Sequence, residues 1–381
     1  PTLQRLVEEP KWQVKISWFE HRPRFTTFHT TLEEFEFGEL GTVESPDQSA
    51  PIICVIDSGI THGNPFLEPV TRHDLLRCFL NEEGDDRYGV NDEVSPDGHG
   101  SGVASLAAYH SINIASGHSN NGELWVTGAR VLDEKCQTGN RLFSAMLRDV
   151  VETYVDFGIR IFNLSINDID KPWHQENKRN VPRNSWIARS LDVLSREYDV
   201  VFVVSCSNIK DDDIDTLLAN GDIYPNYFQR EETSILDPAQ AALALTVGAI
   251  APSTLAIGSV AGLSALADAN HPAPFTRRGP GINREVKPEL VEHGGNYLLD
   301  DSNSTIRNPG TSIIMASNKL TPAITWGLGT SFAAPKVSHK LGMVLADLQA
   351  LGMKSPSAPL LKALMVNSAS YEFLGGGLSA L

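Results

Sequence analysis

Hydrophobic and polar residues follow two different periods along this chain. Short, continuously apolar runs such as 51–56 (PIICVI) and 200–205 (VVFVVS) are typical of parallel strands covered on both faces. Longer segments such as 140–157 repeat their apolar residues at helical spacing. The alternation predicts an α/β fold with a mostly parallel central sheet and helices on both faces. By the same patterns we expect further strands at 124–132 and 158–166 and a further helix at 184–198.

The longest helical stripe lies at 327–348 (GLGTSFAAPKVSHKLGMVLADL), where apolar residues recur at Val337, Leu341, Val344, Leu345 and Leu348. Pro335 is expected in the first turn of this helix, because a missing N–H costs nothing there. Ser331 would then lie at the helix N-terminus, where unpaired N–H groups and the positive end of the dipole favour negative charge. A serine nucleophile suits this place, since its oxyanion intermediate needs donors already in position.

The tripeptide Gly-Thr-Ser does not identify a nucleophile by itself. Before a helix it is more often an ordinary N-cap. The chain also contains a second copy, Gly310-Thr311-Ser312, which no proline or long apolar stripe follows. Other motifs must therefore decide the role of Ser331.

Three motifs together resemble those of the subtilisin-like serine proteases (subtilases). GTSFAAP at 329–335 resembles the serine signature of that family, VIDSGI at 55–60 its aspartate signature and DGHGSGVA at 97–104 its histidine signature. They occur in the family's order of Asp, His and Ser. The resemblance runs from about residue 51 to 381 and implies a three-layer subtilisin-like fold.

The resemblance implies a catalytic triad of Asp57, His99 and Ser331. An aspartate after a strand is usually a cap or a turn former, and a lone histidine is more often structural than catalytic. Their places in the two motifs favour the catalytic interpretation. A serine hydroxyl needs a base, which His99 supplies near neutral pH, and Asp57 would hold the imidazole in one tautomer.

The resemblance also implies an oxyanion hole made by the Asn208 amide and the Ser331 backbone N–H. Ser207 replaces the glycine that precedes this asparagine in the family, and Gly102 stands where many members carry a second histidine. The segment after the strand at 158–166 matches the one that binds substrate, through Asn163, Ser165, Ile166 and Asn167. A glycine is usual at the last of these four positions, so the specificity of the family cannot be carried over.

The proposed chemistry needs no cofactor, and no metal site is predicted for catalysis. Residues 118–123 (HSNNGE) loosely match a loop that binds structural calcium in many subtilases, so structural calcium stays open. The acidic run at 81–93 is interpreted as solvated surface rather than as a calcium site. A second acidic run at 210–215 (KDDDID) is interpreted as a loop near the cleft.

The composition indicates which kinds of partner the chain is expected to bind. The chain of 381 residues has 31 Lys plus Arg against 47 Asp plus Glu, so its net charge is 31 − 47 = −16 and nucleic acid is excluded as a partner. Residues 238–267 carry no charge, but small residues and Pro252 indicate a buried strand followed by a loop rather than a membrane span. Cys54 and Cys206 lie in apolar runs and are interpreted as reduced thiols. With no signal peptide visible, this favours a cytoplasmic location and leaves secretion open.

Two segments are expected, residues 1–50 as a prodomain remnant or adaptor with a strand at 13–20, and residues 51–381 as the catalytic domain. The expected function is a serine endopeptidase that cleaves proteins or peptides through an acyl-enzyme. The alternative is a catalytically silent subtilase-like protein that binds a peptide or a partner. The chain further resembles intracellular bacterial subtilases that are paired with AAA-type ATPases, which implies such an ATPase as a partner.

Overall fold

The computed structural model describes residues 42–82, 86–114, 118–168, 185–258 and 261–369. Its central sheet has seven strands in the order β10-β8-β7-β6-β2-β5-β3, and every neighbouring pair is parallel. The strands are β2 (Ile52–Asp57), β3 (Arg77–Cys78), β5 (Trp125–Arg130), β6 (Ile161–Leu164), β7 (Val201–Ser205), β8 (Leu245–Ile250) and β10 (Leu290–His293). The predicted parallel sheet is confirmed.

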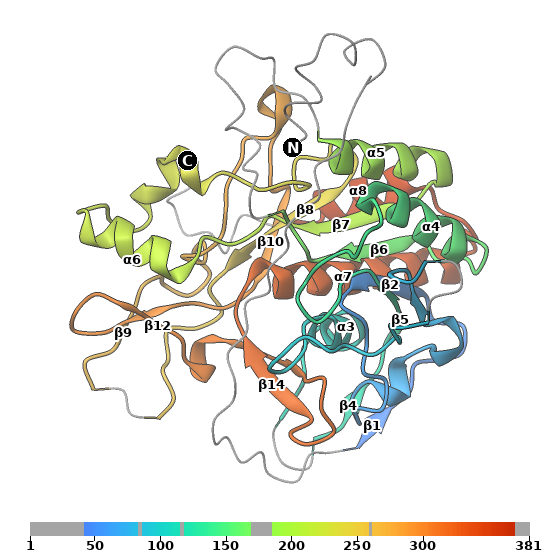
Figure 1. Cartoon of the computed structure of the whole chain (residues 1–381), viewed down its shortest axis with the longest axis horizontal. Helices are drawn as coiled ribbons and strands as arrows, with labels where there is room; N and C mark the ends of the chain where they lie inside the picture. Colours follow the sequence, from blue (N-terminus) through green and yellow to red (C-terminus); the bar gives the residue numbers. More distant parts are fainter. Residues whose placement is uncertain (1–41, 83–85, 115–117, 169–184, 259–260, 370–381) are drawn as a thin grey trace.

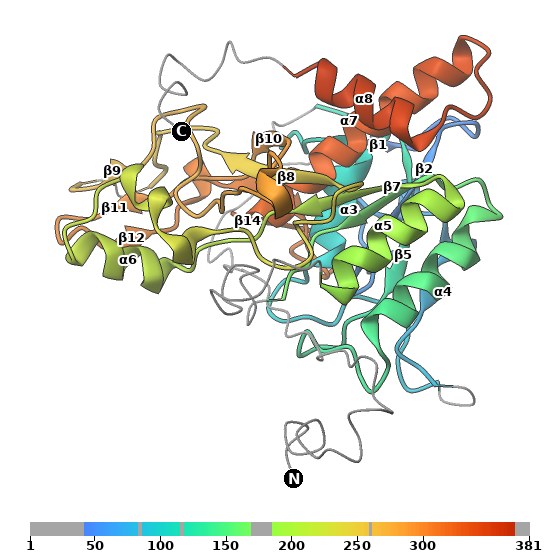
Figure 2. The same cartoon turned by 90° about the horizontal axis from the view of Figure 1, so that it is seen from above.

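Helices cover both faces of this sheet (Figure 1). Helices α4 (Phe143–Val155) and α5 (Trp186–Tyr198) lie side by side on one face. Helices α3 (Gly100–Tyr109), α7 (Thr330–Ala350) and α8 (Ala358–Asn367) pack on the other, as the turned view in Figure 2 shows. The three-layer arrangement expected from the sequence is therefore present.

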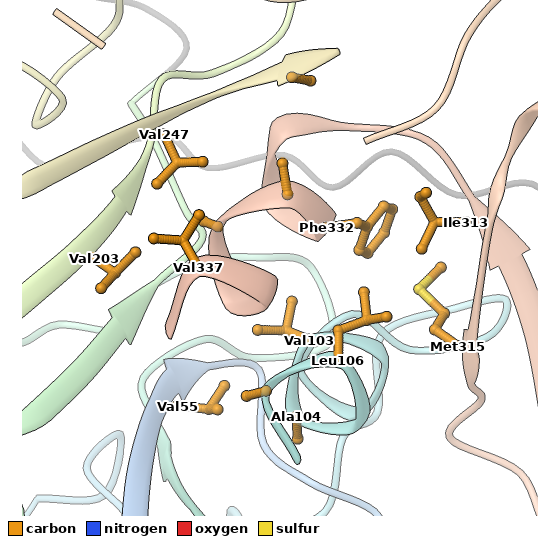
Figure 3. Packing of buried hydrophobic residues seen from close by; sticks show 14 of the residues in the cluster. Val55, Val103, Ala104, Leu106, Val203, Val247, Ile313, Met315, Phe332 and Val337 are labelled. Atoms are coloured by element: carbon orange, nitrogen blue, oxygen red, sulfur yellow. The ribbon is translucent and has the colours of Figure 1, made fainter. Parts of the chain in front are cut away.

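The continuously apolar strands arise because each face of the sheet meets its own hydrophobic core. In β2, Ile53 and Val55 belong to the core shared with α3 and α7, while Cys54 and Ile56 belong to the core shared with α4 and α5. Side chains alternate between the faces of a strand, so a strand covered on both sides needs apolar residues at every position. Figure 3 shows Val55 facing α3 within the first core.

The N-terminal half of helix α7 is buried, and its C-terminal half is partly exposed. From Phe332 to His339 every residue is buried, whereas Ser331 is partly exposed. The expectation that Pro335 lies in the first turn is wrong, because the helix begins at Thr330 and Pro335 is its sixth residue. The missing proline N–H leaves the carbonyl of Ser331 without its partner four residues on.

The remaining elements surround this unit. Strands β13 (Ile313–Ala316) and β14 (Ile324–Gly327) form a hairpin. A small sheet consists of β9 (Ser264–Ala265), β11 (Leu298–Leu299) and β12 (Thr305–Ile306). Strands β1 (Val43–Glu44) and β4 (Asn120–Asn121) form a parallel pair. Short 3₁₀ helices lie at Glu68–Val70, His73–Leu75, Asn226–Gln229, Glu231–Thr233, Ile282–Arg284 and Pro309–Thr311.

The acidic run at 210–215 is not a loop, so that prediction was wrong. It opens helix α6 (Asp211–Ala219), with three aspartates in the first turn. Carboxylates are favoured there because the N-terminal end of a helix carries partial positive charge. Asp211 is also paired with Arg307 at 2.7 Å.

Several other expectations concern the ends and the interior of the chain. The predicted strand at 13–20 lies outside the described residues, and the domain boundary at residue 50 stays a prediction. Strand β8 is followed by an irregular segment, as expected for 238–267. Cys54 and Cys206 are buried and not in disulfides, as expected. Among the described helices, none is long and apolar enough to cross a membrane.

Candidate active site

Asp57 and His99 form a buried, hydrogen-bonded pair at the carboxyl end of β2. Asp57 is the last residue of β2 and His99 immediately precedes α3, and their side chains are 0% and 1% exposed. The Nδ1 atom of His99 lies 2.7 Å from Oδ1 of Asp57. The backbone N–H of Ser58 donates to the same oxygen at 2.8 Å. Since a carboxylate accepts, Nδ1 carries the proton and Nε2 is the basic nitrogen of the ring.

The surroundings of His99 favour its charged form. Burial by itself lowers the pKa of His99, but the charge of Asp57, its hydrogen bond and the charge of Asp92 together outweigh burial and hold this pKa above its ordinary value. An imidazolium formed at this place is therefore stabilised by two neighbouring carboxylates.

Ser331 lies at the start of α7, one residue before Phe332, whose ring packs near His99. It is the second residue of the helix and partly exposed, and its hydroxyl donates to the carbonyl oxygen of Ser165 at 2.9 Å. The ring of Phe332, the following residue, is centred 5.7 Å from the imidazole of His99. Figure 3 shows the Phe332 ring facing Ile313 and Met315, which fix the first turn of α7 against the hairpin strand β13. The fold thus brings the three predicted triad residues to one place.

Asn208 lies just beyond β7 and reaches the same helix end. Its Oδ1 accepts the backbone N–H of Thr330 at 2.8 Å, which orients the amide so that Nδ2 is on the other side. A Cβ placed on Gly329 would lie 3.3 Å from this Nδ2 and 3.7 Å from the backbone nitrogen of Ser331. Both expected oxyanion donors therefore border one point beside Gly329. Its φ of +155° is a conformation that side chains disfavour, which explains the glycine.

The backbone around Asn208 is held from two directions. Ser207 adopts a φ of +78°, so it keeps the conformation natural to a glycine despite its Cβ, at a cost of about 1 kcal/mol. The Arg277 guanidinium donates to the carbonyl of Asn208 at 2.9 Å and to those of Glu232 and Ser234 at 2.8 and 2.9 Å. Burial lowers the pKa of Arg277 to about 10, which leaves it protonated at neutral pH.

Comparison with known proteins identifies the family of this chain. A model of the subtilase family, Peptidase_S8, matches residues 48–379. The chain belongs to the subtilase family. It is 32% identical over 234 residues to the uncharacterized protein y4bN of Sinorhizobium fredii, a match that covers 59% of this chain and 52% of that protein. The match thus spans about half the length of this curated relative.

Solved structures share the subtilisin-like fold at low sequence identity. A lanthipeptide protease is 17% identical with a TM-score of 0.53, and the match covers 84% of this chain and 80% of that one. Sphericase is 17% identical with a TM-score of 0.51, over 86% and 85% of the two chains. The nisin leader peptidase of Lactococcus lactis is 17% identical with a TM-score of 0.50, again over 86% and 85%. These similarities establish the fold of this subtilase.

Two of the residues expected to bind substrate brace the interior of this subtilase. Asn163 is fully buried in β6, where its Nδ2 donates to Oγ of Ser165 at 2.8 Å and its Oδ1 accepts from the Ser338 hydroxyl at 2.9 Å. The side chain of Asn163 thus ties β6 to α7. Ser165 directly follows β6 and presents its carbonyl oxygen to the Ser331 hydroxyl.

The other two residues, Ile166 and Asn167, are also buried. The Asn167 amide donates to the carbonyl of Ser205 at 2.8 Å and accepts from the Ser205 hydroxyl at 2.8 Å. This reciprocal pair links the ends of β6 and β7. The substrate role of these residues stays a prediction, and with these side chains engaged it falls to the backbone of 165–167.

Two further features were missed or left open by the sequence. Asp92 lies in the acidic run interpreted as solvated surface, but its side chain is buried and bonded to the Ser58 hydroxyl at 2.8 Å, so that interpretation was wrong for this residue. No sequence signal marks it within a run of charged residues.

At Gly102, a Cβ would lie 2.6 Å from the sulfur of Met315, so methionine occupies the space of any side chain there.

In the segment matched to a calcium loop one side chain is already engaged, and structural calcium stays a prediction. Residues Asn120–Asn121 form strand β4, and the Asn120 amide closes on the backbone of Asn113, with Oδ1 accepting at 2.7 Å and Nδ2 donating at 3.0 Å. Since Oδ1 already accepts an N–H, it does not suit calcium, which needs several oxygen ligands. Within the described ranges, no group of three or more His, Cys, Asp or Glu side chains is arranged to hold a metal.

Proposed function

We propose that this subtilase is a serine endopeptidase with Asp57, His99 and Ser331 as its triad. The observation that carries the proposal is the 2.7 Å contact between His99 and Asp57 beside the partly exposed Ser331. A buried aspartate that fixes one imidazole tautomer is what a serine nucleophile requires of its base. Asn208 supplies the fourth group, at the same helix end.

The first half of the reaction forms the acyl-enzyme. The Ser331 hydroxyl turns from the Ser165 carbonyl towards His99 by rotation about its Cα–Cβ bond. As Oγ attacks the substrate carbonyl carbon, Nε2 of His99 takes the hydroxyl proton, and Asp57 stabilises the resulting imidazolium without itself being protonated.

Charge develops on the substrate carbonyl oxygen in the same step. The Ser331 backbone N–H and the Asn208 amide donate to this oxyanion from fixed positions. The intermediate then collapses, the peptide C–N bond breaks, and His99 returns its proton to the leaving amine. A water molecule, activated by His99 in the same way, hydrolyses the acyl-enzyme and restores Ser331.

Every step uses groups of this chain, so the chemistry requires no cofactor. The substrate is a protein or peptide whose backbone lies along residues 165–167. A catalytically silent binding protein does not need these four groups in a catalytic arrangement, whereas an endopeptidase needs all of them. Their arrangement therefore favours the enzyme.

The test is cleavage of an unbiased peptide library, with new termini identified by mass spectrometry. We expect the wild-type protein to produce new termini, Ser331→Ala to produce none and Ser312→Ala to match the wild type. Equal cleavage by wild type and Ser331→Ala, or none by the wild type, would contradict the proposal. An AAA-type ATPase partner stays a prediction, tested by co-purification from the native host.

A further inference from the structure

A second buried carboxylate lies behind the Asp57–His99 pair. The Asp92 side chain is 3% exposed, yet both of its oxygens accept hydrogen bonds. Oδ1 accepts from the Ser58 hydroxyl at 2.8 Å and from the Val94 backbone N–H at 3.3 Å. Oδ2 accepts from the Ser101 backbone N–H at 2.9 Å. A buried charge of this kind persists only where donors compensate its lost hydration.

Ser58 connects the two carboxylates. Its Oγ lies 2.8 Å from Oδ1 of Asp92 and 3.2 Å from Oδ1 of Asp57, and it accepts the backbone N–H of Gly100 at 3.0 Å. The hydroxyl has one proton, which the shorter distance assigns to Asp92. Asp57 then keeps two donors on this oxygen, the ring of His99 and the Ser58 backbone N–H.

Asp92 also helps to cap helix α3, which the side chain of His99 does not do. The residue before a helix normally caps it with its own side chain. His99 holds that place, but its side chain makes no cap hydrogen bond and is directed to Asp57 instead. The first two N–H groups of α3, from Gly100 and Ser101, are taken by Ser58 and Asp92.

We propose that Asp92 is a positioning residue for the reaction of His99. It holds the start of α3 and Ser58 so that the imidazole stays on Asp57, and its negative charge stabilises the imidazolium formed during proton transfer. This inference rests on the proposed peptidase function.

The charged groups around His99 are consistent with a stabilising role for Asp92. Asp57 approaches from β2 and Asp92 from the loop before α3. Asp97, on the same loop, is neutralised by Lys319 at 2.8 Å and bonded to Thr325 at 3.1 Å, both from the hairpin side. The first turn of α7 presents only uncharged residues to the ring. Asp57 and Asp92 both act on His99 through their charges.

The test compares Asp92→Asn with Asp97→Asn, a matched control on the same buried loop. Asparagine can still accept the Ser101 N–H, but it carries no charge, and its NH₂ group turns the Ser58 hydroxyl towards Asp57. Both effects make His99 less basic. We expect the acidic limb of the kcat/KM profile to move down by about half to one pH unit, and kcat to fall about tenfold with KM within twofold. Asp97→Asn should lose stability and leave the limb in place.

Two further measurements keep the inference separable from the proposed function. NMR titration of the His99 imidazole needs no turnover, and we expect its pKa to be lower in Asp92→Asn than in the wild type. Asp92→Glu restores the charge with altered geometry, so it should restore the acidic limb while kcat stays low. An unmoved limb and an unmoved His99 titration in Asp92→Asn would overturn the inference, even in an active peptidase.

If Asp92→Asn does not fold, Ser58→Ala tests the same connection. Alanine keeps the backbone N–H on Asp57 and removes only the hydroxyl that links the carboxylates. We expect kcat to fall with KM unchanged, and a wild-type kcat would reject the role of this connection. Failure of the peptidase proposal looks different, since the wild-type protein would then cleave no peptide.

Discussion

The chain contains the tripeptide Gly-Thr-Ser twice, and the two copies differ in what surrounds them. At Gly310-Thr311-Ser312 the backbone forms a single 3₁₀ turn, and Asn308 supplies the cap from the same turn. Its Oδ1 accepts the Gly310 N–H at 2.9 Å, its Nδ2 donates to the Ile257 carbonyl at 3.0 Å, and its own carbonyl accepts the Ser312 hydroxyl at 2.8 Å. In this copy the serine hydroxyl closes its own turn, and Asn308 anchors that turn to the backbone of Ile257.

At Gly329-Thr330-Ser331 the capping asparagine is Asn208, which is 122 positions away in sequence. Its Oδ1 accepts the Thr330 N–H, while its NH₂ group has no hydrogen-bond partner among the described residues. At this copy the fold brings together Asn208, from the segment after β7, and His99, from the start of α3. The two copies are therefore distinguished by the groups that the fold brings to each of them, and the surrounding motifs mark this difference in the sequence.

The largest expected effect separates the two serines. Ser331→Ala should reduce kcat by about 10⁶-fold, the loss seen when the nucleophile of another subtilase is removed. Ser312→Ala should change kcat by no more than a few fold, because that hydroxyl only closes its own turn. Both rates are measured on one peptide from the library. Comparable losses in the two variants would remove the distinction.

The two asparagines give the next largest difference. Asn208→Leu should lower kcat by about 10²–10³-fold with little change in KM, because its amide donates to the oxyanion and not to the ground state. Asn308→Leu should lower the unfolding temperature instead and leave kcat within a few fold. A drop of only a few fold in Asn208→Leu would show that its amide is directed elsewhere in the reaction.

Ser331, unlike Ser312, is proposed to react with the help of a titrating histidine. This difference should appear in the pH dependence of the rate. His99 must be neutral to accept a proton, and its pKa is raised, chiefly because Asp57 and Asp92 outweigh the opposing effect of burial. The kcat/KM profile should therefore fall about tenfold per pH unit on the acid side, with a midpoint above the ordinary histidine value of about 6.5. A midpoint below that value in the wild-type profile would contradict this assignment.

The smallest effect concerns how Asn208 is held. Ser207→Gly removes the Cβ from a residue at a φ of +78° and should stabilise the protein by up to about 1 kcal/mol, partly offset by the entropy of glycine in the unfolded chain. Denaturant unfolding measures this change, and kcat should stay within twofold. A large loss of kcat would mean that Ser207 itself restrains the Asn208 amide.

The sequence was sufficient for the sheet and the main helices, and it named the three residues that are proposed as the triad. Runs such as the one in β2 were identifiable because two cores demand apolar residues at every position. Asp57, His99 and Ser331 were identifiable because they stand in motifs with a known order. Both signals are local in sequence, so no knowledge of tertiary contacts was needed.

What the sequence did not predict depends on contacts between distant segments. Asp92 belongs to an acidic run, but its buried side chain accepts a hydrogen bond from the hydroxyl of Ser58, 34 positions away in sequence. Asn163 and Asn167 were expected to face substrate, but partners on α7 and β7 engage their side chains. Helix α7 begins at Thr330, whose N–H is bonded to the distant Asn208, so Pro335 lies beyond the first turn.

The most direct test of the central claim is labelling by a fluorophosphonate, followed by mass spectrometry of the digested protein. Such a probe reacts with a serine only where a base and an oxyanion hole activate it. We predict one modified residue, Ser331, with labelling lost in Ser331→Ala and retained in Ser312→Ala. Absence of labelling, or modification of Ser312 in place of Ser331, would contradict the account.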